Sequence, residues 1–79
     1  MRIISQNGRI DVPYEEVVIS IAHEEIDESE DVEAYMQGAK SMIWLGNYKN
    51  FKEANYVVEK IRQAYQCDTK LFYMEKVGR

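Results

Sequence analysis

The chain has 79 residues, a formal net charge of −4 and a single cysteine. A chain of this length forms one domain that buries roughly 60–65% of its unfolded surface, and one cysteine excludes an internal disulfide framework. No apolar run approaches the ~20 residues of a membrane span, and the N-terminus lacks a secretory signal pattern. We therefore expect a cytoplasmic protein with no membrane partner.

The charges are distributed unevenly along the chain. Residues 1–33 carry ten acidic and two basic residues, whereas residues 34–79 carry eight basic and four acidic ones. Such a separation either guides association with a charged partner or another copy, or simply places each group of charges in solvent. The sequence leaves both interpretations open.

The first predicted element is a β-hairpin with strands over residues 1–6 and 9–12. Asn7 and Gly8 between them are typical of a type I′ turn, because both tolerate positive φ. Apolar and polar residues alternate in the second strand, which indicates one buried face. Pro13 lacks an amide hydrogen, so it ends the pairing or restricts it to a sheet edge.

A third strand is predicted over residues 17–23, where β-branched residues give one bulky and one smaller face. The following residues, 24–31, include six carboxylates. We expect a mobile loop there, because dense like charges repel each other. Alternation resumes over residues 32–37, and Gly38 starts a turn into the next strand.

Residues 41–48 are predicted as a strand with apolar residues on both sides, which is typical of a strand covered on both faces. Gly46 is expected to weaken this strand. Helical spacing starts at Phe51, with Asn50 as N-cap and Glu53 three residues later as its capping-box partner.

The predicted helix covers residues 51–66 and is amphipathic. Its apolar stripe consists of Phe51, Ala54, Val57, Val58, Ile61, Ala64 and Tyr65. Tyr56 points away from the stripe and is predicted to be exposed. Because a helix of this length is marginal alone in water, the stripe requires a sheet to pack on.

Together these patterns predict an α+β fold, an antiparallel β-meander of four or five strands with one C-terminal helix packed on one face. The strands are drawn from residues 1–6, 9–12, 17–23, 32–37 and 41–48. Residues 71–74 form a short apolar run within 70–75. This run is either a further edge strand or a tail that packs on a neighbouring molecule.

The acidic segment contains a pattern similar to a calcium-binding loop, Asp27-x-Ser29-x-Asp31. The sixth position is Val32 where a glycine is needed, and the twelfth is Gly38 where a bidentate glutamate is needed. We therefore predict no specific metal site; weak association with divalent ions is the alternative.

His23 and Cys67 are the candidate soft ligands or nucleophile–base pair. His23 is predicted to end a strand and Cys67 to end a helix, and no motif surrounds either residue. No phosphate-binding loop, nucleophile elbow or zinc spacing is present in the sequence. We predict no cofactor and no enzymatic activity, with a small metal-binding or hydrolytic protein as a remote alternative.

The region around the helix offers side chains that nucleic-acid binding commonly uses. They are Lys49, Lys52, Lys60, Arg62, Tyr48 and Tyr56. The acidic overall charge opposes the approach of phosphates. A solubilising helix face is the competing interpretation.

Residues 1–8, Met-Arg-Ile-Ile-Ser-Gln-Asn-Gly, precede a Pro-Tyr-Glu element, and Leu-Gly-Asn-Tyr at 45–48 precedes Glu53-Ala54. These motifs resemble those of small proteins from phages and prophages of low-GC Gram-positive bacteria, over about two thirds of the chain. The motifs describe turns and packing. The resemblance implies no established activity, so it assigns no functional residue.

From these observations we predict a small non-enzymatic interaction or assembly module that associates with itself or with another phage or host protein. Its second sheet face has apolar candidates in Val18, Ala22, Tyr35 and either Ile43 or Trp44. The candidate interaction surface is Tyr35, Trp44, Tyr56, Lys52, Arg62 and Phe72. A nucleic-acid-binding accessory protein that uses the basic helix face is the alternative.

Overall fold

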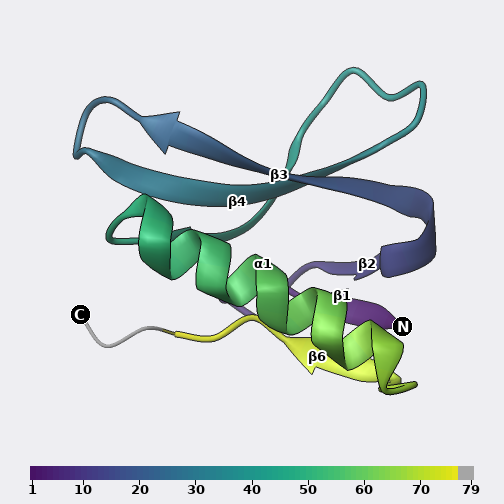
Figure 1. The fold of residues 1–79 in the computed structure, drawn as a ribbon. Helices are drawn as coiled ribbons and strands as arrows, with labels where there is room; N and C mark the ends of the chain where they lie inside the picture. The colour runs from purple at the N-terminus through teal and green to yellow at the C-terminus, as the bar shows by residue number, and fades with distance from the viewer. Residues whose placement is uncertain (77–79) are drawn as a thin grey trace.

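The computed structural model describes residues 1–76 and contains six strands, one short 3₁₀ helix and one α-helix (Figure 1). The elements are β1 (Arg2–Ile4), β2 (Asp11–Pro13), η1 (Tyr14–Glu16), β3 (Val17–Glu24), β4 (Ser29–Met36), β5 (Ile43–Tyr48), α1 (Phe51–Gln66) and β6 (Leu71–Tyr73). The predicted α+β class is confirmed, with a C-terminal helix packed on an antiparallel sheet.

The strands form two sheets where the sequence predicted one meander. Sheet B has the order β3-β4-β5 and is antiparallel, whereas sheet A has the order β2-β1-β6, with β6 parallel to β1. The first hairpin does not continue into β3, because Pro13 ends β2 and η1 then redirects the chain. Residues 71–73 are an edge strand of sheet A.

The loop of the first hairpin is wider than the predicted two-residue turn. Ser5 N donates to Ile10 O at 2.8 Å, and Gly8 N donates to Ser5 O at 2.9 Å. Gly8 has a φ of 74°, but Asn7 does not adopt positive φ. The Asn7 Oδ1 atom instead accepts from Ser5 Oγ and from Arg9 N. The predicted hairpin is confirmed. The prediction of a type I′ turn is wrong, because these side-chain hydrogen bonds stabilise a longer loop.

The acidic segment is mostly strand. β3 and β4 pair continuously from Val17 opposite Met36 to Glu24 opposite Ser29, which leaves only residues 25–28 as a turn. Ser29 is buried, and both its amide and its hydroxyl donate to Asp27 Oδ1. The prediction of a loop over residues 24–31 is wrong, because ladder pairing and these hydrogen bonds offset the charge repulsion.

The predicted bounds of the helix are confirmed. Asn50 Oδ1 accepts a hydrogen bond from Glu53 N at 2.9 Å, so Asn50 is the N-cap. Glu53 Oε1 accepts in return from Lys49 N at 3.2 Å, one residue before the cap. The helix therefore starts where these side chains satisfy its open amides.

The helix buries a narrower stripe than predicted. Ala54, Val57 and Ile61 are buried, whereas Phe51 is 59% and Tyr65 43% exposed. The prediction that Phe51 and Tyr65 lie in the core is wrong, because they stand on the first and last turns of a helix that crosses the two sheets obliquely (Figure 1). The predicted exposure of the Tyr56 side chain is confirmed at 54%.

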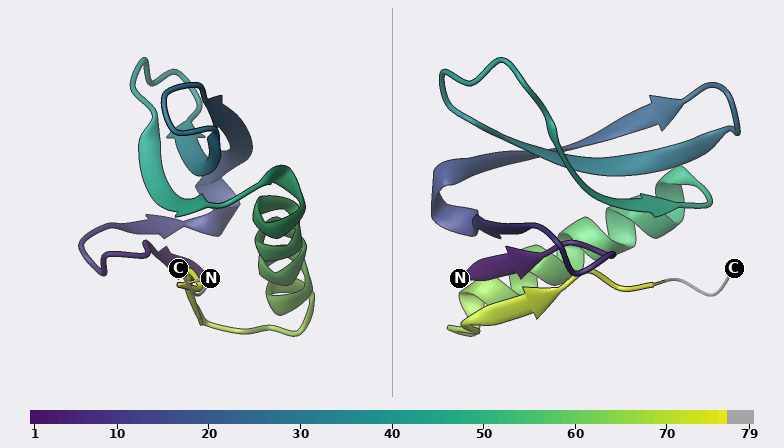
Figure 2. Two further views of the ribbon diagram at one scale, coloured as in Figure 1. Left: turned by 90° about the vertical axis from the view of Figure 1, so that its left-hand side faces the viewer. Right: turned by 180° about the vertical axis from the view of Figure 1, so that it is seen from behind.

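A single hydrophobic core lies between the two sheets and α1. In Figure 2, sheet B lies above sheet A and α1 runs alongside both. The buried apolar residues are Ile3, Val12, Val32, Ala34, Leu45, Tyr48, Ala54, Val57, Ile61 and Met74. Both sheets and the helix contribute, so none of the three layers has a separate core.

Gln6 links the two sheets. Its amide donates to Leu45 O of β5 at 2.7 Å. Its side-chain Nε2 donates to Asn47 O at 3.2 Å and to Glu75 O at 2.8 Å, and its Oε1 accepts from Asn47 N at 2.8 Å. One glutamine thus connects the first hairpin, β5 and the segment that follows β6.

Gly46 allows this close approach. A Cβ atom at this position would lie 3.1 Å from both Gln6 Cδ and Tyr48 Cε2. Gly46 was expected to weaken the strand, but the strand does not end there, since β5 continues to Tyr48. The buried Tyr48 ring donates its hydroxyl hydrogen to Glu75 O at 2.8 Å, and burial raises its pKa to about 12.

Candidate functional site

Sheet B has one face against the core and one face that points away from α1. The ladder pairings, together with the burial of Val32 and Ala34 on the core side, define the second face, which we name the outer face. Its residues are Val18, Ser20, Ala22, Glu24, Ser29, Asp31, Glu33, Tyr35, Trp44 and Asn47. Within residues 1–76, neither a helix nor another strand packs on it (Figures 1 and 2).

Two predicted interaction residues, Tyr35 and Trp44, lie together on the outer face. Tyr35 pairs across the ladder with Val18, and Trp44 pairs with Glu33, two residues before Tyr35 on the same strand. Diagonal neighbours at this spacing are within reach of aromatic rings. Between the two alternatives left open by the sequence, the structure places Trp44 on the outer face and Ile43 on the core side, opposite Ala34.

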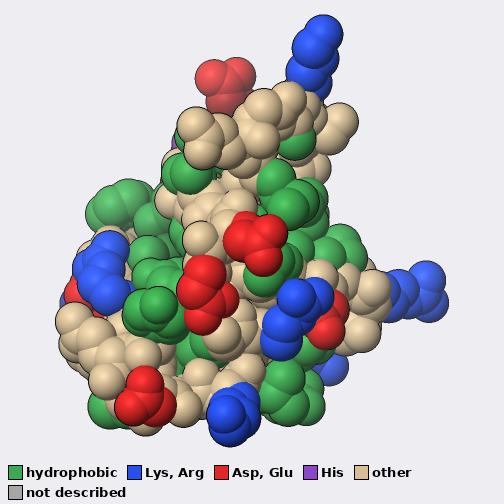
Figure 3. All heavy atoms as spheres, turned by 90° about the vertical axis from the view of Figure 1, so that its right-hand side faces the viewer, with side chains coloured by type: hydrophobic (Ala, Val, Ile, Leu, Met, Phe, Trp, Pro, Cys, Tyr) green, Lys and Arg blue, Asp and Glu red, His purple; other side chains and the backbone are tan. Residues whose placement is uncertain are grey.

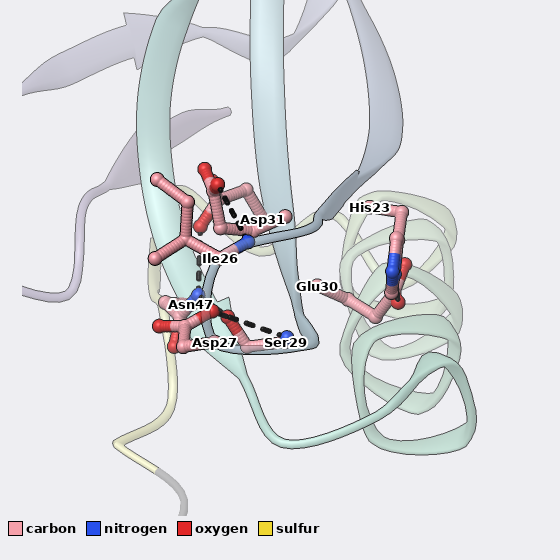
Figure 4. Close-up of polar contacts among 8 residues, drawn as sticks. His23, Ile26, Asp27, Ser29, Glu30, Asp31 and Asn47 are labelled. Atoms are coloured by element: carbon pink, nitrogen blue, oxygen red, sulfur yellow. Dashed lines mark hydrogen bonds and ion pairs between the residues drawn. The ribbon is translucent and has the colours of Figure 1, made fainter.

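A hydrogen-bond network joins Trp44 to the β3–β4 turn; Figure 4 shows its members Asp27, Ser29, Asp31 and Asn47. Trp44 Nε1 donates to Asp31 Oδ1 at 3.2 Å, and Asn47 Nδ2 donates to the same oxygen at 2.8 Å. Asn47 Nδ2 also donates to Ser29 Oγ at 2.8 Å, and Ser29 Oγ donates to Asp27 Oδ1 at 2.5 Å. The network fixes the indole orientation without needing a ligand.

The residues of the calcium-like pattern take part in this network. Asp27 lies in the turn, whereas Ser29 and Asp31 lie on β4 and bond to Asn47. In the part of the chain that the structure describes, no three His, Cys, Asp or Glu side chains are grouped as a metal site requires. The three residues of the pattern therefore belong to the β3–β4 hairpin, Asp27 to its turn and Ser29 and Asp31 to β4.

His23 and Cys67 are not brought together. His23 Nδ1 pairs with Glu30 Oε2 at 2.5 Å, and this hydrogen bond raises the pKa of the His23 imidazole above its usual value. Cys67 is exposed and follows the last turn of α1, at the opposite end of the molecule from the end of β3 (Figure 1). The arrangement is not that of a nucleophile and its base.

Lys52 and Tyr56 lie on the solvent side of α1, away from the outer face. The Lys60 ammonium lies 5.3 Å from the centroid of the Tyr56 ring. Lys52 and Tyr56 line a shallow groove that is also lined by the carboxylate residues Glu53 and Glu75. The basic and aromatic groups here are accompanied by acidic ones.

Arg62 and Phe72 occupy two further places. Arg62 forms an ion pair with Glu59 on the same helix and lines a small groove beside β3. Phe72 is half-buried in β6 and packs against the core. The six predicted surface residues are therefore spread over separate regions, and only Tyr35 with Trp44 and Lys52 with Tyr56 lie together.

The basic side chains do not form a continuous strip on the face drawn in Figure 3. Lys and Arg side chains there are separated by hydrophobic and acidic ones. A nucleic-acid backbone is usually tracked by clustered positive charge. This face lacks that clustering.

Sequence reasoning missed Gln6 and Asn47, which position the candidate surface. Gln6 holds β5 in place, and Asn47 ties Asp31 to the β3–β4 turn. The only signal available was a polar residue inside an otherwise apolar strand. That signal does not reveal the bonding partner, because each partner lies far along the chain.

Comparison of the chain with protein-family models, curated proteins and solved structures finds no match. The resemblance to phage and prophage proteins therefore stays a prediction. Among the described residues, no helix has both the length and the apolar character needed to cross a membrane.

Proposed function

We propose that this protein is a cytoplasmic, non-enzymatic interaction module, encoded by a phage or prophage, that associates with itself. The observation that carries the proposal is the outer face of sheet B, which presents Tyr35, Trp44 and the exposed Val18 on neighbouring strands. Antiparallel sheets usually present a polar surface on their solvated face. Aromatic and apolar residues in that position favour a protein contact.

The Trp44 indole is ordered before any partner binds. Asp31 fixes the Trp44 indole, and Asn47 fixes Asp31 in turn. A preorganised aromatic side chain loses little conformational entropy on binding, which is a property of interface anchors. This order supports a binding role for the surface.

The charge distribution favours another copy as the partner. The β3–β4 hairpin carries much of the acidic surplus of residues 1–33, and α1 carries Lys52, Lys60 and Arg62. α1 also carries Glu53 and Glu59, so three basic and two acidic residues give it a net charge of +1. Each molecule therefore presents a strongly acidic hairpin and a weakly basic helix. Complementary regions of this kind steer the association of two identical chains.

Light scattering after size exclusion tests the proposal directly. Across roughly 1 to 500 μM protein, a concentration range that covers weak and standard interfaces, we expect the mass to rise from the 9.3 kDa of one chain toward twice that value. A mass of one chain over the whole range would contradict self-association.

Nucleic-acid binding is the alternative, and one observation favours it. Lys52, Tyr56 and Lys60 are spaced four residues apart, so they form one stripe along α1. Labelled single-stranded and duplex DNA should then bind with an affinity that falls steeply between two salt concentrations. The Lys52→Ala/Lys60→Ala variant should lose this binding. An absence of binding at low salt would eliminate the alternative.

A further inference from the structure

β3 is an edge strand of sheet B, and the side of this strand that faces away from β4 has no neighbouring strand in the described part of the chain. Its eight residues pair with β4 on one side only. Apart from the ladder with β4, no backbone hydrogen bond joins residues 18–23 to another described segment of the chain. Every second amide and carbonyl of β3 is therefore available to a further strand.

The other sheet edges are short or covered. β2 has three residues and ends at Pro13, and β6 has three residues. The free side of β5 meets the Gln6 backbone and side chain. β3 contains no proline, lysine or bulge, the features that normally prevent a strand edge from pairing with another chain.

A small groove lies next to this open edge, on the core side of the strand between β3 and α1, and hydrophobic residues make up most of its lining. Its lining residues are Tyr14, Val17, Ile19, Val58, Ile61 and Arg62. A strand added to β3 would project every second side chain over this groove. The edge thus offers both backbone partners and a place for apolar side chains.

We propose that the occupant is a second copy of this chain, with β3 paired antiparallel to β3 around a two-fold axis near Ser20. The two copies of sheet B then form one continuous six-stranded sheet. This inference rests on the self-association proposed above and specifies the surface through which it occurs. It also leaves both Tyr35–Trp44 pairs on the same side of the joined sheet.

The strand is complementary to itself. Ile19 and Ile21 point to the core side of β3, so each copy supplies apolar side chains to the groove of the other. Antiparallel pairing around Ser20 places Glu24 and the acidic turn at residues 25–28 beside Glu15 and Glu16, which precede β3 in the other copy, near Arg62. Like charges therefore oppose the pairing at its two ends, and the apolar side chains at its centre favour it. A two-fold contact uses both open edges at once and closes the assembly at a dimer.

The expected affinity follows from the size of the contact. Eight residues span about 26 Å of strand, so the interface falls at or below the lower limit of about 1,200 Å² for stable complexes. We therefore expect a dissociation constant of about 1 to 100 μM, typical of a small contact with few anchors.

Hydrogen exchange measured at two protein concentrations tests the edge directly. At a total protein concentration of about ten times the dissociation constant, roughly 20% of the chains remain monomeric, so every second amide of β3 should exchange roughly fivefold more slowly than in dilute solution. The amides on the free edge of β6 serve as an internal control and should not change with concentration.

Two matched variants test the side chains. Ile19→Glu places a carboxylate in the groove, which solvent reaches in the monomer but the paired strand covers in the dimer. Sedimentation should show dimer affinity at least about tenfold weaker, because a buried charge is left unpaired. Gln63→Glu adds the same charge to an exposed site on the solvent side of α1 and should leave the affinity unchanged. Circular dichroism checks that both variants fold.

The outcomes separate this inference from the proposed function. Dimers whose β3 amides are protected from hydrogen exchange support both the edge pairing and self-association. Dimers whose β3 amides stay unprotected overturn the edge pairing and leave self-association intact, with Trp44→Ser then testing the outer face. Monomers at every concentration overturn both. If Ile19→Glu does not fold, hydrogen exchange of the unmodified protein decides whether β3 forms the dimer contact.

Discussion

His23 and Glu30 face each other at the end of the β3–β4 ladder, and the hydrogen bond between them favours the protonated imidazole. The pKa of His23 is therefore raised above the usual 6.5. A raised pKa in the folded state means that the pair stabilises the fold fully below about pH 6.5, where the unfolded imidazole is also charged. The contribution is lost as the pH rises through the folded-state pKa.

We expect this pair to make stability depend on pH in the neutral range. The free energy of unfolding of the native chain should exceed that of His23→Gln at pH 5.5, and the difference should shrink as the pH rises to about 9. Urea denaturation at a series of pH values measures it. Glu30→Gln should remove the same pH dependence, and a difference between native chain and His23→Gln that stays constant with pH would contradict the assignment.

At the scale of elements, the helix shows how far periodicity predicts packing. The sequence identified its two ends and its N-cap, because capping and spacing are local properties. The stripe was predicted too wide, because periodicity assigns a direction to each side chain but not the extent of the surface that it meets. Ile61 faces the shared core and is buried, whereas Phe51, on the first turn, is exposed.

This difference predicts unequal effects of two alanine substitutions in the same stripe. Ile61→Ala should lower the free energy of unfolding by about 3 kcal/mol, because it leaves a cavity in the shared core. Phe51→Ala should cost less than about 1 kcal/mol, as expected for an exposed side chain. Chemical denaturation followed by circular dichroism compares them. Equal losses would show that Phe51 belongs to the core.

At the scale of the whole molecule, Gln6 is the polar contact that joins sheet A, sheet B and the C-terminal segment. Its three side-chain hydrogen bonds lie in a partly buried site above Gly46. Removing the side chain leaves the Asn47 amide without this acceptor. The junction should therefore contribute to the cooperativity of the two sheets.

We expect Gln6→Ala to lower the free energy of unfolding by about 2 kcal/mol, because the side-chain hydrogen bonds are lost and the backbone groups that made them lose this partner. Gln37→Ala, at an exposed loop position, is the matched control and should change stability by less than about 0.5 kcal/mol. Gly46→Ala should be better tolerated in the Gln6→Ala background, since one of the two close contacts is gone. Additive effects of Gln6→Ala and Gly46→Ala would argue against the contact.

The candidate surface could be predicted in part. Tyr35 and Trp44 were identified from alternation, and the structure brings them onto one face. The sequence alone could not show whether these two residues lie on one surface with Lys52, Tyr56, Arg62 and Phe72. Those residues lie on other elements, and the angle between elements depends on the packing of the core.

The sequence by itself determined the features that depend on neighbours within a few residues, namely the helix bounds, the first hairpin and the α+β class. Only the tertiary structure decided that β6 pairs with β1, that the strands divide into two sheets, and that the acidic segment completes a β-ladder. The physical reason is that strand pairing satisfies backbone groups between distant segments. The choice of partner depends on burial of the whole chain at once.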